Sequence, residues 1–116
     1  STEQGSRETE RILLRLQNGE AQQVYDAASL DFQQSSSVSY LEEMGARIQG
    51  LGKPTVKFDF NRFGEAAIDS HYDKGSAVQN VRMPVIVEFG RQTMRGNVAL
   101  TQLNGRQWLL TDLELR

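Results

Sequence analysis

The first half of the chain places hydrophobic residues at the spacing of amphipathic helices. Residues 7–17, 20–29 and 39–51 each repeat apolar positions at intervals of three and four, which puts them on one helical face. The apolar sets are Ile12, Leu13 and Leu16; Ala21, Val24, Tyr25 and Ala28; and Leu41, Met44, Ile48 and Leu51. Ser39 and Glu42 form a capping box that opens the third helix. Gly19 ends the first helix, and Gly52 with Pro54 ends the third. Three N-terminal helices are therefore predicted.

The second half alternates apolar and polar positions, which is typical of strands with one buried face. Pro84 interrupts the longest of these runs and indicates a sheet edge or a bulge. Asn104 and Gly105 form the strongest hairpin signal, because both residues tolerate positive φ. The strand after this turn is apolar on both faces, so we expect it to lie centrally in the sheet. The predicted strands are residues 56–60, 81–89, 94–100 and 107–115, and residues 67–71, in the least regular segment, are the candidate for a further short strand.

Helices followed by antiparallel strands predict an α+β fold, with three N-terminal helices packed on a curved sheet of about four strands. At 116 residues the chain is expected to be one domain over residues 7–116. Residues 1–6 are polar and are expected to be disordered.

The composition excludes several kinds of protein. The chain has no cysteine, which excludes disulfides and thiolate metal sites. The net charge is -2 and the basic residues are scattered, so no nucleic-acid partner is expected. No apolar run reaches the ~20 residues of a membrane span, so this segment is not expected to insert into a membrane. No cofactor is indicated.

The order and punctuation of these elements resemble the nuclear-transport-factor-2-like fold, also called cystatin-like. The similar residues are Leu16–Glu20 with the later Tyr25, Leu51-Gly52, Val85–Phe89, and the terminal hairpin from Leu100 to Leu110. Small bacterial domains of unknown function, often secreted or lipoprotein-anchored, share this pattern most closely. The resemblance implies a cone in which a curved sheet wraps the helices. It implies no activity, because this fold carries enzymes, transport adaptors and interaction domains alike.

His71 is the only histidine, and it alternates with Asp69 and Asp73. On a strand these three side chains would share one face and could bind a metal ion. The alternative interpretation is a solvated strand edge followed by a turn, with Tyr72 pointing inward. His71 could also act as a general base, which would require a dry pocket around it.

Two further surfaces are predicted from the strand pattern. Phe63, Tyr72 and Trp108 are the aromatic residues that we expect nearest a ligand pocket at the mouth of the cone. Filling of the core is the alternative for such residues. The polar face of the long strands suggests a weak homodimer through the sheet, and its residues are Arg82, Ile86, Glu88 and Arg95. A monomer with a wet sheet face is the alternative.

Two functions remain open at this stage. The first is a non-enzymatic binding or interaction module in the bacterial cell envelope or outside the cell. The second is a small-molecule-binding protein or enzyme, isomerase-like or dehydratase-like, that uses the cone cavity with His71 as the acid–base group. A sizeable cavity with ionisable side chains would favour the second function, and a filled interior would favour the first.

Overall fold

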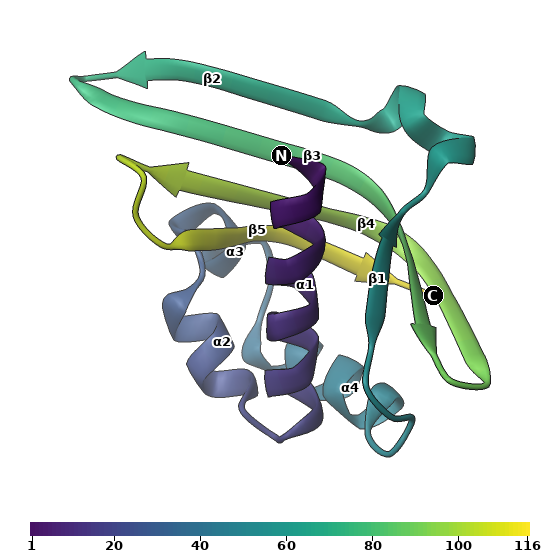
Figure 1. Ribbon diagram of the computed structural model, residues 1–116. Helices are drawn as coiled ribbons and strands as arrows, with labels where there is room; N and C mark the ends of the chain where they lie inside the picture. The colour runs from purple at the N-terminus through teal and green to yellow at the C-terminus, as the bar shows by residue number, and fades with distance from the viewer.

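The computed structural model describes all residues from Ser1 to Arg116 and has four helices followed by five antiparallel strands (Figure 1). The helices are α1 (Thr2–Gln17), α2 (Ala21–Ala27), α3 (Leu30–Ser35) and α4 (Val38–Ile48). The strands are β1 (Thr55–Phe58), β2 (Ala67–Asp73), β3 (Ser76–Phe89), β4 (Gln92–Leu103) and β5 (Trp108–Leu115), with a 3-10 segment η1 (Phe60–Glu65) between β1 and β2. The predicted α+β class is confirmed, with one more helix than expected.

The first helix begins earlier than predicted. It starts at Thr2 because Ser1 caps it: the Ser1 hydroxyl accepts a hydrogen bond from Gln4 N (3.3 Å), and Gln4 Oε1 accepts one from the Ser1 amino group (3.1 Å). This reciprocal pair satisfies two donors at the helix start. Residues 1–6, which we expected to be disordered, therefore belong to the cap and first turns of α1.

Two other serines cap the starts of α3 and α4. The hydroxyl of Ser29 accepts from Phe32 N (3.1 Å) and opens α3, a helix that the pattern did not predict. The hydroxyl of Ser37 accepts from Tyr40 N (3.1 Å) and opens α4. Ser39, the predicted cap, is therefore inside the helix, because Ser37 takes the capping position first.

Strand β3 is central, and two short strands share one of its sides. The sheet order is β1-β3-β4-β5, and β2 also pairs with β3. β1 pairs with residues 85–88 of β3, whereas β2 pairs with residues 76–82. Pro84 lies in the gap between them, and its carbonyl accepts from Asp59 N (3.0 Å). Because the N and O of one strand residue point the same way, the nitrogen of Pro84 faces this gap and no ladder hydrogen bond is lost. Pro84 was expected to mark a sheet edge or a bulge. In the structure the strand that runs beside β3 is interrupted opposite Pro84.

Strand β5 lies at the edge of the sheet and not in its centre, because it pairs only with β4. Its two apolar sets both reach the core because of a β-bulge: Leu110 pairs with Leu100 and Asp112 with Ala99, so Thr111 is unpaired and Leu110 and Leu113 turn to the same side. Helices cover the free edge of this strand. Three carbonyls of β5 accept hydrogen bonds from helical or capping residues: Leu110 from Ser29 N (2.9 Å), Leu113 from Tyr40 Oη (2.6 Å) and Leu115 from the Arg47 guanidinium (3.3 Å).

The core lies between the helices and one face of the sheet. The alternation predicted for residues 81–89 is confirmed, since the odd-numbered residues from Val81 to Phe89 are buried. Phe32 of α3 and Leu41 of α4 are fully buried in the same core. We call the opposite face of the sheet the outer face. No helix in this chain combines the length and the apolar character that crossing a membrane requires.

Candidate functional site

The predicted triplet of Asp69, His71 and Asp73 lies on the outer face of β2. The register pairs His71 with Val78, and Ile68 with Val81, whose side chain points into the core. Because side chains alternate along a strand, the side chain of His71 points away from the core, while Tyr72 shares the core-side face. His71 therefore does not reach the core between the helices and the sheet. No three metal-binding side chains come together in the chain.

A chain of polar contacts runs from β2 across β3 to β4 on this face. His71 Nδ1 lies 2.6 Å from Asp69 Oδ2, and Asn80 Nδ2 donates to the same oxygen (3.3 Å). The hydroxyl of Thr101 donates to Asn80 Oδ1 (2.6 Å). Asp69 orients the imidazole through Nδ1, so Nε2 remains available to exchange a proton or a hydrogen bond with a ligand. Asp73, at the turn, takes no part in these contacts.

An open groove with a volume of about 340 Å³ follows this network. Its floor is formed by β2, β3 and β4, and α3 contributes to one wall. The polar residues that line it are Asp31, Asp69, Asn80, Arg82, Thr101 and Thr111. The groove is open to solvent, so charges in it are screened by water. His71 does not line the groove, and its side chain is 46% exposed, so the imidazole lacks the dry surroundings that a general base needs.

The three aromatic residues predicted for a ligand pocket lie at three separate places. Phe63 is on η1 with 72% of its surface exposed, and Tyr72 is on β2 with 81% exposed. Trp108 is half-buried at the start of β5 and packs against the core. Of the three, only Trp108 lines the hollow between α1 and β5.

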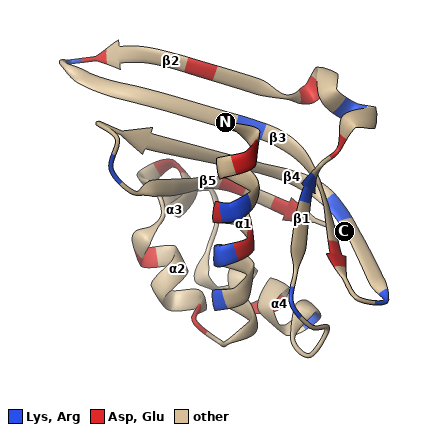
Figure 2. Ribbon diagram, in the orientation of Figure 1, with Lys and Arg blue, Asp and Glu red and all other residues tan.

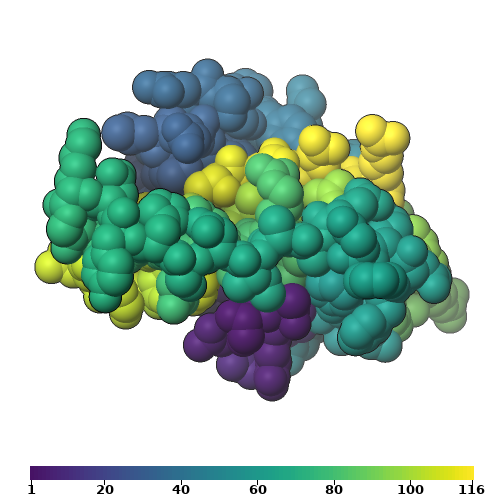
Figure 3. Space-filling view, turned by 90° about the horizontal axis from the view of Figure 1, so that it is seen from above, coloured from purple at the N-terminus to yellow at the C-terminus, as the bar shows by residue number.

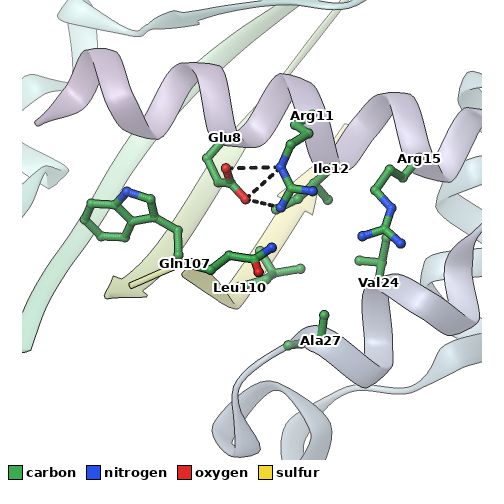
Figure 4. Close-up of a pocket in the computed structure, with 10 residues that line it drawn as sticks. Glu8, Arg11, Ile12, Arg15, Val24, Ala27, Gln107 and Leu110 are labelled. Atoms are coloured by element: carbon green, nitrogen blue, oxygen red, sulfur yellow. Dashed lines mark hydrogen bonds and ion pairs between the residues drawn. The ribbon is translucent and has the colours of Figure 1, made fainter. Parts of the chain in front are cut away.

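This hollow is shown in Figure 4, where Glu8 and Arg11 of α1 face Leu110 of β5 and Gln107, which precedes that strand. Its volume is about 20 Å³, which is room for about one water molecule. The Arg11 guanidinium binds Glu8 at its mouth, and this hydrogen bond raises the pKa of Arg11. The space under the sheet is thus filled by side chains at this end.

The residues predicted for a dimer face form ion pairs within the chain. Figure 2 shows acidic and basic positions interspersed along the strands of the sheet. Arg82 pairs with Asp112 (3.4 Å), Glu88 with Lys57 (2.8 Å) and Arg95 with Asp59 (3.6 Å). Ile86, between them, is half-buried. The charges on the outer face therefore have partners without a second subunit.

Asp59 is the most buried charge in the molecule, and the sequence pattern did not reveal it. Its side chain is 2% exposed, with Arg95 Nη1 at 3.6 Å and Arg62 Nη1 at 3.8 Å. Arg62 also donates to Gly96 O (3.2 Å) and binds Glu65, whose pKa it lowers. These contacts fix η1 onto the outer face of the sheet. The spacing of three residues between Asp59 and Arg62 was the signal in the sequence that could have indicated η1.

The architecture defines the class of protein as an α+β domain with N-terminal helices on a five-stranded antiparallel sheet. Comparison with protein-family models and with curated proteins found no match for this chain.

Proposed function

We propose that the chain is a non-enzymatic binding or interaction module with a nuclear-transport-factor-2-like fold. Support for this fold comes from the order of elements, with helices first and an antiparallel sheet afterwards. The hairpin at Asn104-Gly105, which was part of the resemblance, supports it further through the positive φ of both residues. A bacterial origin and a place in the cell envelope or outside the cell belong to the same proposal, and fractionation of cells that produce the full-length protein tests them.

Two exposed phenylalanines on η1 carry the proposal of a binding module. Phe60 is 79% exposed and Phe63 is 72% exposed, although Phe60 contacts the ring of Phe58 edge-on. Burying one such side chain at an interface contributes about 1.5–3 kcal/mol. Asp59 and Arg62 hold η1 in place, so both rings are presented on a fixed support. This is the arrangement expected of apolar anchors for a partner molecule.

Photo-crosslinking tests this proposal directly. A benzoyl-phenylalanine at position 63 of the full-length protein, in its own cells, is expected to form a discrete adduct. The same probe at Gln22 on α2, at the far end of the molecule from η1 (Figure 1), serves as the control. Phe60→Ser is expected to abolish the adduct formed at position 63. Identical adduct patterns at positions 63 and 22 would contradict the proposal.

The polar groove supports a second candidate function, the binding or conversion of a small polar molecule on the outer face. Asp69, which lines the groove, would then contact the ligand, with His71 beside it and with Asn80 and Thr101 orienting the carboxylate. Two-dimensional NMR spectra with a library of small polar compounds test this function. Shifts confined to the groove and abolished by Asp69→Asn would support it. Spectra without shifts in the groove would count against it.

A further inference from the structure

The three strand edges of the sheet are treated differently. Helical and capping residues bind the edge of β5, as described above, and Glu10 of α1 accepts from Val56 N (2.9 Å) at the edge of β1. No side chain or loop donates to or accepts from the backbone of Ile68, Ser70 or Tyr72 in β2. All seven residues of β2 are exposed, and Figure 3 looks onto β2 and η1 with no helix over them. A strand edge of this length without lysine, proline or a cover is prepared to pair with another strand.

The backbone groups that face outward on β2 can be assigned from the neighbouring strand. Tyr72 pairs with Ala77, yet Ala77 uses its own N–H and C=O toward Asn104 on the β4 side, at 2.8 and 2.7 Å. The backbone of Tyr72 therefore points away from β3. Because this direction alternates in an antiparallel ladder, Ser70 and Ile68 also present their N–H and C=O groups to the free edge.

The side chains of β2 are self-complementary about Ser70. In an antiparallel copy centred there, Ile68 would oppose the partner's Tyr72, and Asp69 would oppose the partner's His71. The first pair joins two side chains that are 60% and 81% exposed, and the second joins a carboxylate to an imidazole. Both are favourable cross-strand pairs. The outward backbone groups of Ile68, Ser70 and Tyr72 would all meet a partner in this register.

Neighbouring registers lack this complementarity. The outward backbone donors and acceptors match only in registers that place Ile68, Ser70 or Tyr72 of one copy opposite one of these three residues in the other copy. A register centred on Asp69 would oppose two Asp69 carboxylates across the two-fold axis. A register centred on His71 would oppose Asp69 to the partner's Asp73. Like charges directly opposite each other are destabilising, so one register is selected.

We propose that the free edge of β2 pairs with β2 of a second copy of this chain, antiparallel and centred on Ser70. The two sheets then continue into one another across the two-fold axis. The interface is small, so association in the micromolar range is expected. This dimer is independent of the partner proposed for η1, because purified protein alone is enough to form it.

A single cysteine tests the register, because the chain contains none. Ser70→Cys would place two sulfurs on the two-fold axis, with Cα atoms about 5.5 Å apart in a hydrogen-bonded pair, which suits a disulfide. Ile68→Cys is the matched control, since two such cysteines would lie four residues apart along the ladder, about 13 Å. Mild oxidation of purified protein is expected to link the first variant at least tenfold faster. Equal rates of linkage would overturn the proposal.

Sedimentation of the purified protein tests the edge itself. Ser70→Pro removes an outward N–H and leaves the ladder to β3 intact, so the dimer dissociation constant is expected to rise at least about tenfold. Ser70→Ala keeps the N–H and is expected to keep the dimer. Asp69→Lys is expected to weaken it, and adding His71→Asp to Asp69→Lys is expected to restore it. A monomer at several hundred micromolar, or a dimer lost with Ile86→Asp but kept with Ser70→Pro, would overturn the proposal.

Discussion

The contact between α1 and α4 allows one substitution to be predicted in sign and magnitude. Gly45 of α4 lies against the last turn of α1, and a Cβ atom at this position would be 2.6 Å from Leu16 O. Ordinary contact requires at least about 3.4 Å. The carbonyl of Leu16 cannot withdraw freely, because it accepts a hydrogen bond from Gly19 N (3.1 Å). Gly45→Ala must therefore push the two helices apart.

Two opposing contributions determine the net effect of Gly45→Ala. Alanine is favoured over glycine within a helix by about 1 kcal/mol. Overpacking against a fixed backbone costs about 3 kcal/mol, the upper end of the usual range. We therefore expect the free energy of unfolding to fall by about 2 kcal/mol. Gly5→Ala in α1 is the matched control, because the nearest atom to its Cβ is the flexible thioether sulfur of Met83, at 3.1 Å. Gly5→Ala gains the same helix propensity with little overpacking.

Urea denaturation followed by far-ultraviolet circular dichroism measures both variants. The expected result is a lower transition midpoint for Gly45→Ala and an equal or higher midpoint for Gly5→Ala, with unchanged slopes. If Gly45→Ala were as stable as the parent protein, α1 and α4 would not be in contact through this residue. Loss of stability in both variants would also refute the reasoning, because a flexible side chain and a fixed carbonyl would then be equivalent.

Three further predictions concern stability. Burial, together with the carboxylates of Glu114 and Asp112, raises the pKa of Tyr40. The stability that this shift contributes is complete below about pH 10, where the unfolded phenol ionises, and is lost as the pH rises through the folded pKa. In alkaline urea titrations, the decline of the free energy of unfolding with pH should therefore be shallower for Tyr40→Phe. Asp59→Ala leaves two arginines without their buried carboxylate and should lower the free energy of unfolding by about 2 kcal/mol, whereas an unchanged urea midpoint would contradict the assigned burial. Phe32→Ala empties a fully buried position and should cost about 3–5 kcal/mol, measurable by calorimetry.

The periodic features of the fold could be predicted from the sequence, because each depends on neighbours close along the chain. The left-handed turn at Gly19 ends the first helix as expected, with φ of 78°. Asn104 and Gly105 adopt φ of 53° and 67°, as the predicted hairpin requires. The start of α4 was wrong by two residues because two serines compete for one cap. Local sequence favours both Ser37 and Ser39, and Ser37 makes the capping hydrogen bond with Tyr40 N.

The candidate site could be predicted only in part, because its contacts are distant in sequence. The alternation of Asp69 and His71 on one face of a strand was visible, and it is confirmed. Asn80 lies 11 residues beyond Asp69, and Thr101 lies 21 residues beyond Asn80. Both join the network only through strand register. No periodicity connects such residues. The central position predicted for β5 was wrong because a β-bulge at Thr111, set by the pairing with β4, turns Leu110 and Leu113 into the same core.

The break at Pro84 connects these observations. β3 is 14 residues long, and the two short strands β1 and β2 share one of its sides. Because proline lacks an N–H, the neighbour is divided, and Asp59 with Arg62 anchors η1 in the gap. The chain re-enters the sheet as β2, beyond the helices that cover the edges of β1 and β5. The same local break thus exposes the phenylalanines of η1 and leaves the edge of β2 without a partner, so one part of the molecule presents both proposed interaction surfaces.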